Sequence, residues 1–111
     1  MSKADRASVF AALGDPVRLE LLARIGDGGS ITQLATGLPI TRQAVTRHLG
    51  VLEHAKLIEA RRCGREIRFV ARPARLRQAK GWLDDVARQW DGTLERLRVH
   101  IESAPVRFPG A

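Results

Sequence analysis

The sequence contains no tyrosine, only one cysteine, and few aromatic residues, which make up 5% of its 111 residues. RNA-binding sheets stack bases on aromatic rings, so this scarcity counts against that class. One cysteine, Cys63, permits no intrachain disulfide, which fits a reducing compartment.

No apolar run approaches the ~18 residues of a membrane-spanning helix, and the N-terminus lacks the pattern of a signal peptide. We therefore expect a cytoplasmic protein that does not enter a membrane.

Patterns typical of an enzyme are also missing. We find no Ser/His/Asp or Cys/His set, no phosphate-binding glycine loop and no carboxylate pair in an obvious cleft. We expect no catalytic residues and no cofactor.

Positive charge is abundant and concentrated. The formal net charge is +7, and residues 61–77 contain seven arginines against one glutamate. Residues 1–40 are balanced, and residues 82–102 carry five acids against three arginines. A solvated arginine-rich surface is the alternative, but like charges packed this densely repel one another unless a partner screens them. The distribution favours a polyanionic partner.

Helix signals follow one another closely in the first half of the chain. The length predicts one domain, residues 1–103, followed by a loose tail over 104–111. Apolar spacing predicts a helix over 4–13, and Asp15 with Pro16 marks the start of a second helix that ends at Gly26. After a loop over 27–29, Ser30 and Gln33 form a capping box for a third, short helix that ends at Gly37.

A longer fourth helix, 41–54, begins at Thr41 as its N-cap and completes helix-turn-helix spacing. Two short strands, 57–62 and 66–70, are predicted around a turn that contains Gly64. A final helix is predicted from about residue 74 to 103. The expected fold is mainly α with a small β-hairpin wing, a winged helix-turn-helix of five helices and two strands.

The fourth helix has one apolar stripe, Val45, Leu49 and Leu52. The opposite side carries Gln43, Thr46 and Arg47, with Arg42 in the first turn and no acid among the four; the remaining outward position, 50, is a glycine. Gln, Arg and Thr hydrogen-bond base edges in a major groove. A basic amphipathic helix without nucleic acid is the alternative for this element alone, but the arginine-rich hairpin beside it favours DNA. His48, at the margin of the stripe, is interpreted as a packing and hydrogen-bonding residue rather than a base contact or a pH switch.

The stretches "LGDPVRLELLARI", "TRQAVTRHLGVLEHAKLI" and "CGRE" resemble the ArsR/SmtB family of bacterial winged-helix repressors, across roughly residues 10–101. The resemblance implies a homodimer that pairs through its first and last helices, and a recognition helix that faces DNA beside an arginine-bearing wing. The candidate DNA-binding residues are Thr41, Arg42, Gln43, Thr46, Arg47, Arg62, Arg65 and Arg68. The candidate dimer-interface residues are Phe10, Trp82, Val86, Trp90, Leu94 and Leu97.

The resemblance does not extend to the metal sites of that family. Its metal sensors carry a cysteine pair in the third helix, or His and acidic ligands on the last helix. Here the third helix has no cysteine, and the last has a single histidine, His100. One thiol and scattered histidines do not supply a four-ligand zinc site within one subunit, so we expect a member without the metal site; a site shared across the dimer is the alternative.

The leading hypothesis is a sequence-specific double-stranded DNA-binding repressor that binds a pseudo-palindromic operator as a homodimer. One alternative is a protein-interaction module that binds an acidic partner. Another is a thiol-responsive regulator that uses Cys63, whose arginine neighbours favour a thiolate. The apolar stripe of the last helix is interpreted as a dimer seam, with a pocket for an apolar effector as the alternative. The sequence does not identify an effector.

Overall fold

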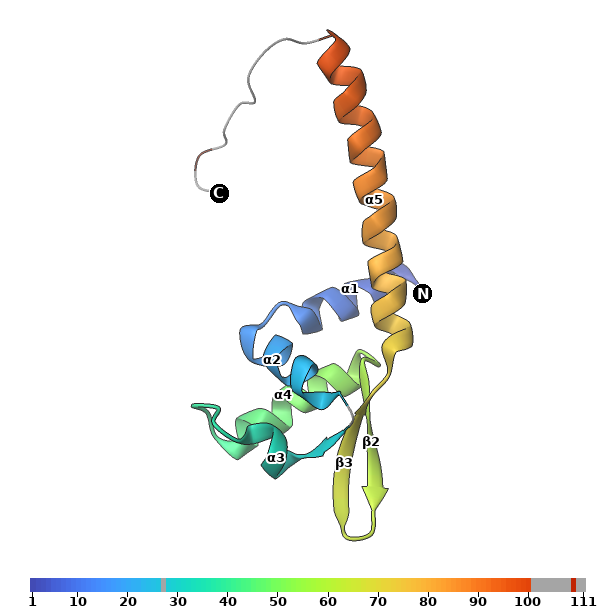
Figure 1. Cartoon of the computed structure of the whole chain (residues 1–111). Helices are drawn as coiled ribbons and strands as arrows, with labels where there is room; N and C mark the ends of the chain where they lie inside the picture. The colour runs from blue at the N-terminus through green and yellow to red at the C-terminus, as the bar shows by residue number, and fades with distance from the viewer. Residues whose placement is uncertain (27, 101–108, 110–111) are drawn as a thin grey trace. The chain divides into compact units, whose positions relative to one another are not determined.

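The computed structural model of the chain describes residues 1–26, 28–100 and 109 (Figure 1). The chain forms two compact units, Met1–Lys80 and Gly81–Ala111. The first contains the helix-turn-helix and the hairpin. The described part of the second is the later portion of the last helix. The predicted end of that helix, 101–103, lies outside the described residues, as does the predicted tail except for residue 109.

The first two helices begin at strong N-caps. Helix α1 spans Lys3–Leu13 and starts with a capping box of Ser2 and Asp5, which the sequence pattern alone did not reveal. Helix α2 spans Pro16–Ile25, and the Asp15 carboxylate accepts hydrogen bonds from the backbone N–H groups of Val17 and Arg18 at 2.9 and 3.1 Å. The predicted Asp15–Pro16 start is confirmed. These caps satisfy N–H groups that have no partner inside the helix.

The helix-turn-helix consists of α3 (Ile31–Ala35) and α4 (Arg42–His54). The predicted Ser30–Gln33 capping box is present, and Thr41 caps α4 by accepting from the N–H of Ala44 at 3.0 Å. The predicted end of the third helix at Gly37 is wrong, because α3 stops at Ala35 with Thr36 as C-cap. Gly37 instead has φ +77° in the following turn, a left-handed conformation that glycine adopts at little cost.

Helix α4 ends in a Schellman motif built on a lysine. Leu57 donates its N–H to the carbonyl of Leu52 at 3.1 Å, and Lys56 donates to the carbonyl of Glu53 at 2.9 Å. Lys56 has φ 62°, the one non-glycine residue with positive φ in the described part of the chain. Leu52 and Leu57 are both buried, so the motif turns the chain directly from the helix into the sheet.

Three strands form an antiparallel sheet in the order β1-β3-β2. The hairpin consists of β2 (Ile58–Cys63) and β3 (Glu66–Ala71). Compared with the predicted strands, 57–62 and 66–70, the first begins and ends one residue later, and the second ends one residue later. The predicted loop over 27–29 is wrong at its last residue, because Gly29 and Ser30 form a short strand, β1, that pairs with Phe69 and Arg68 of β3. Two residues have no readable strand periodicity, so this pairing arises from the tertiary fold.

The core of the first unit joins all these elements. Helix α5 spans Pro73–His100 and contributes Ala79 to it. Figure 1 shows the β2–β3 hairpin projecting away from α1, α2 and α4, with α3 next to it. The buried apolar residues are Val9, Ala12, Leu21, Ile25, Leu34, Val45, Leu49, Leu52, Ala55, Leu57, Ile58, Phe69 and Ala79.

Candidate nucleic-acid interface

Helix α4 has the two faces that its periodicity predicted. Val45, Leu49 and Leu52 have no exposed surface, which confirms the buried stripe. The polar residues on the other side are all exposed: Arg42, Gln43, Thr46 and Arg47. The helix is therefore anchored by its stripe and presents its polar side chains to solvent.

The hydrogen-bonding state of these side chains limits what each can recognise. Within residues 1–26 and 28–100, the side chains of Arg42, Gln43 and Arg47 have no hydrogen-bond or ion-pair partner, so their donors are available. The Thr46 hydroxyl donates to the carbonyl of Arg42 at 3.0 Å. Thr46 therefore offers its methyl group and an acceptor lone pair outward, but no donor.

The wing is a tight hairpin in which some arginines have side-chain partners and others have none among the described residues. Cys63 pairs with Glu66 across a two-residue turn, in which Gly64 has φ +65°. Arg62 and Arg65 are exposed, and neither has a hydrogen-bond or ion-pair partner among the described residues. No carboxylate of the described ranges neutralises their charges.

Two other wing arginines are held by neighbouring side chains. The Arg61 guanidinium donates to Glu59 Oε1 at 2.6 and 2.8 Å. Arg68 lies 3.7 Å from a Glu66 oxygen, and its Nη2 donates to Gln33 Oε1 at 3.4 Å. Arg68 was a candidate contact on the same basis as Arg62 and Arg65, yet its guanidinium links the wing to the start of α3.

Helix α4 and the wing meet at a hollow of about 450 Å³. Arg42, at the start of α4, and Arg65, in the wing turn, both line it. The other lining residues are Ser30, Ile31, Thr32, Glu66 and Ile67. The fold thus brings two unneutralised arginines from separate elements to the edge of one concave surface.

Two arginines of α2, which were not among the candidate site residues, contact the helix-turn-helix. Arg24 Nη1 donates to the carbonyl oxygens of Leu34 and Thr36, at 3.1 and 2.6 Å, where α3 ends. Arg18 donates to His48 Nδ1 of α4 at 3.2 Å. His48 is half-buried, which agrees with its interpretation as a packing and hydrogen-bonding residue.

The carboxylates at the first two N-caps are stabilised in their charged form. The hydrogen bond from the Arg18 backbone N–H, then that from Val17, lowers the pKa of Asp15 below its ordinary value of 3.8, against a smaller opposing effect of desolvation. Hydrogen bonds from the side chain and backbone of Ser2 lower the pKa of Asp5 in the same way, with a further contribution from Arg75. Both carboxylates are therefore charged at neutral pH.

Comparisons with known proteins identify the helix-turn-helix of this chain. A family model described as a helix-turn-helix domain matches residues 13–61. The HTH-type transcriptional regulator YuzN of Bacillus subtilis is 33% identical over 89 residues, which cover 72% of this chain and 97% of YuzN. CmtR of Mycobacterium tuberculosis H37Rv, also an HTH-type transcriptional regulator, is 34% identical over 87 residues, 78% of this chain and 74% of CmtR.

A solved structure gives the family. The ArsR-like transcriptional regulator from Rhodococcus sp. RHA1 is 38% identical, covers 90% of this chain and 96% of its own, and has a TM-score of 0.77. The chain belongs to the ArsR family. It is a transcriptional regulator with a helix-turn-helix DNA-binding domain, and the relatives named above are regulators rather than enzymes.

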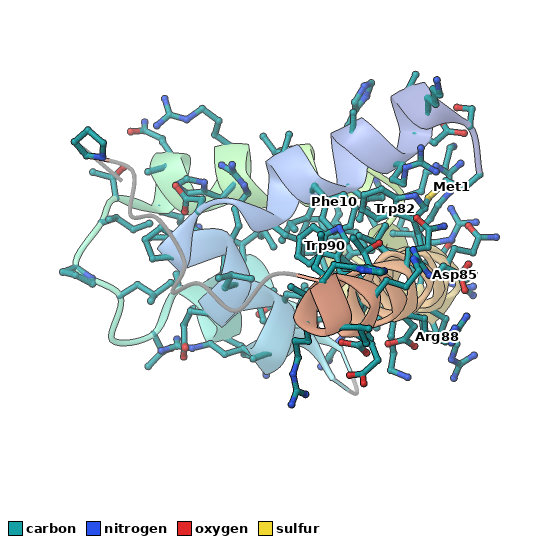
Figure 2. All side chains as sticks on the ribbon, turned by 90° about the horizontal axis from the view of Figure 1, so that it is seen from above. Met1, Phe10, Trp82, Asp85, Arg88 and Trp90 are labelled. Carbon is teal, nitrogen blue, oxygen red and sulfur yellow. The ribbon has the colours of Figure 1, made fainter. Side chains whose placement is uncertain are left out.

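The ArsR fold presents an apolar row on α5 within the second unit. Trp90, Leu94 and Leu97 are 67%, 58% and 45% exposed. Figure 2 shows Asp85 and Arg88, which form an ion pair, on a different side of α5 from Trp90. Trp90 therefore lies on a different side of the helix from this ion pair, and Val86, another predicted interface residue, is half-buried.

In this ArsR-family chain, no group of three or more His, Cys, Asp and Glu side chains is placed to hold a metal ion within the residues described. Cys63 is an exposed free thiol at the end of β2. No helix of the described ranges combines the length and hydropathy needed to cross a membrane.

Proposed function

We propose that the protein is a transcriptional repressor that binds a pseudo-palindromic operator as a homodimer. The exposed side of α4 reads base edges, and the arginine-bearing wing holds the adjacent backbone. The observation that carries this proposal is the pair of Arg42 and Arg65 at the shared hollow, with Arg47 and Arg62 of the same helix and hairpin also unneutralised. Nucleic-acid phosphates are the ligands that such a set of free guanidinium groups suits best.

Three side chains of α4 and its N-cap, Thr41, have distinct expected roles. The free guanidinium of Arg47 and the free amide of Gln43 suit bidentate contacts with guanine and adenine respectively. Thr46, whose hydroxyl proton is already donated to Arg42, suits a thymine methyl or a base amino group. Thr41 accepts from the Ala44 N–H, which leaves its hydroxyl proton for a phosphate oxygen.

The wing is expected to make contacts that do not depend on sequence. Arg62 and Arg65 have no carboxylate partner in the described part of the chain, so both guanidinium groups are available to phosphates. Arg68 is proposed as a weaker contact, because Gln33 and Glu66 already engage its guanidinium.

Dimerisation is proposed through α1 and α5, with Phe10 on the first helix and the exposed α5 row on the second. A contiguous row of apolar side chains is unfavourable when it is exposed to water. A second copy of the chain removes the row from water, and the two-fold axis of a dimer covers both copies in the same way. A two-fold dimer presents two recognition helices to half-sites about 34–36 Å apart, one turn of DNA.

The test begins with selection of DNA duplexes from a random library by the purified protein. We expect an enriched sequence with two related half-sites. A mobility-shift titration then compares that duplex with a scrambled one at fixed salt. Equal affinity for both duplexes, or no shift at low salt and micromolar protein, contradicts the proposal and favours binding to an acidic protein partner.

A further inference from the structure

Arg18 connects three helices through a single guanidinium group. It belongs to α2, it contacts the end of α1, and it reaches His48 on α4. We propose that Arg18 is a positioning residue for the recognition helix, which acts through His48, so that the DNA selectivity of α4 depends on the hydrogen bond between these two side chains. This inference rests on the proposed function and specifies how the reading surface is held.

The guanidinium is first anchored to the end of α1. Arg18 Nε donates to the carbonyl of Ala12 at 2.7 Å, and Nη2 donates to the carbonyl of Ala11 at 3.1 Å. Carbonyls in the last turn of a helix lack partners within it and carry partial negative charge. The last turn of α1 contains no basic residue of its own, so Arg18 supplies the cation from the next helix.

Asp15 restrains the same group from the start of α2. Its Oδ2 lies 3.9 Å from Arg18 Nη1, while Oδ1 accepts from the backbone N–H of Arg18. The side chain of Arg18 is 17% exposed. A planar group with two carbonyls, a carboxylate and little solvent contact has little freedom to turn, so its remaining N–H groups have fixed directions.

One of those fixed donors meets the recognition helix. Arg18 Nη1 lies 3.2 Å from His48 Nδ1. A guanidinium only donates, so Nδ1 must accept, and the hydrogen of the neutral imidazole is then on Nε2. His48 lies between the exposed Arg47 and the buried Leu49 in sequence, at the border between the reading side and the core.

The Arg18–His48 hydrogen bond gives α4 a directional restraint that its apolar stripe does not provide. Burial of Val45, Leu49 and Leu52 determines which side of α4 faces the core, but apolar attraction is non-directional. A hydrogen bond to a rigid donor fixes the rotation of the helix about its axis more narrowly. Bidentate base contacts require accurate placement, whereas phosphate contacts position the protein without reading sequence. Loss of the Arg18–His48 bond is therefore expected to lower selectivity more than general DNA affinity.

The experiment compares three variants with the unchanged protein on the selected duplex and on its scrambled counterpart. H48L keeps an apolar side chain of similar size but has no acceptor, and we expect the ratio of the two affinities to fall about tenfold. H48N places a carbonyl oxygen near the position of Nδ1 and is expected to keep the ratio within about threefold. H54L is the matched control, because His54 is an exposed histidine on the same helix with no hydrogen-bond partner among the described residues.

A second comparison separates positioning from a general structural role. R18K carries a single ammonium that does not reproduce the set of contacts, so it is expected to lower the ratio as H48L does. The double variant R18K/H48L is expected to have the same affinity ratio as R18K alone, since R18K already removes the Arg18–His48 hydrogen bond. If R18K does not fold, as judged by circular dichroism, the histidine variants decide the question alone.

The outcomes distinguish this inference from the proposed function. If the unchanged protein selects no sequence, the proposed function fails, and this inference fails with it. If it selects a sequence and H48L keeps the full ratio, or the two losses add, only the positioning role is overturned. Nitrogen-15 NMR of the imidazole gives a readout without DNA: the hydrogen is expected on Nε2, and its presence on Nδ1 also overturns the inference.

Discussion

Arg42, the first residue of α4, and Arg65, in the turn of the wing, line the same hollow of about 450 Å³ although they belong to different elements. Among the described residues, neither guanidinium has a carboxylate partner. A phosphate at the mouth of this hollow meets both charges, so the two residues are expected to act on affinity rather than on sequence preference.

Arg65→Ala is therefore expected to weaken binding to operator and scrambled DNA alike. Removing one arginine–phosphate interaction reduces the slope of log affinity against log salt by about 1. The slope is measured by titration at several salt concentrations. Arg88→Ala is the control, because Arg88 lies on α5 and pairs with Asp85. An unchanged slope in Arg65→Ala would remove this residue from the interface.

Gln43→Ala and Arg47→Ala are expected to affect selectivity instead. Each variant lacks one bidentate base contact, which costs ~1–3 kcal/mol of discrimination for the preferred base. Selection from a random library with each variant is expected to relax the preference at one position of each half-site. Retention of the full preference by both variants would show that another surface reads the DNA.

Trp90→Glu and Leu94→Glu are expected to convert a dimer into a monomer. A charge placed in the exposed α5 row is desolvated without a partner when the row is covered. Sedimentation at micromolar concentration is expected to give twice the 12.3 kDa chain mass for the unchanged protein and the chain mass for the variants. The matched control is Asp85→Ala, on a different side of the helix (Figure 2). A monomeric unchanged protein contradicts the proposed assembly.

Lys56→Gly is expected to stabilise the fold. Lys56 has φ 62° at the end of α4, and the left-handed conformation costs a residue with a Cβ atom roughly 1–2 kcal/mol. Part of that gain is offset because glycine gives the unfolded chain more freedom, so an increase of about 1 kcal/mol in the free energy of unfolding is expected from urea titration. Lys56→Ala keeps the Cβ atom and removes the charge, and it is expected to show no such increase.

Asp15 is expected to make stability depend on pH at the acid end. Because hydrogen bonds lower its pKa below 3.8 in the folded state, the unfolded state binds the proton more readily. The stabilisation is therefore present in full above that value and is lost as the pH falls through the lower, folded pKa. Asp15→Asn keeps an acceptor at the cap but does not titrate in this way. Urea midpoints between pH 5 and pH 2 are expected to fall less steeply in the variant, and equal slopes would contradict this origin.

Much of the fold was readable from local signals. Asp15–Pro16, the Ser30–Gln33 box and Thr41 each act through a backbone N–H two or three residues away, so their effect is contained in the sequence. The buried stripe of α4 follows from a periodicity of about 3.6 residues. Boundaries were less predictable: α3 stops at Ala35, and Gly29 joins a strand because β3 is beside it.

The candidate interface was predictable as a set of residue types but not as a set of free side chains. Arg61 and Arg68 each have a glutamate two positions away in the sequence, and the strands bring each pair within ion-pair distance. The contact of Arg68 with Gln33, 35 positions away, depends on the tertiary fold.

The sequence by itself determined where the helices start, which side of α4 is buried, and that positive charge is concentrated in residues 61–77. Tertiary structure alone decided that Arg68 contacts Gln33, that Arg42 and Arg65 share one hollow, and that Arg18 meets His48 thirty positions along the chain. The physical reason is range. Caps and periodicity act within a few residues, whereas a partner for a long, flexible guanidinium depends on which distant backbone and side-chain atoms folding brings within about 3 Å.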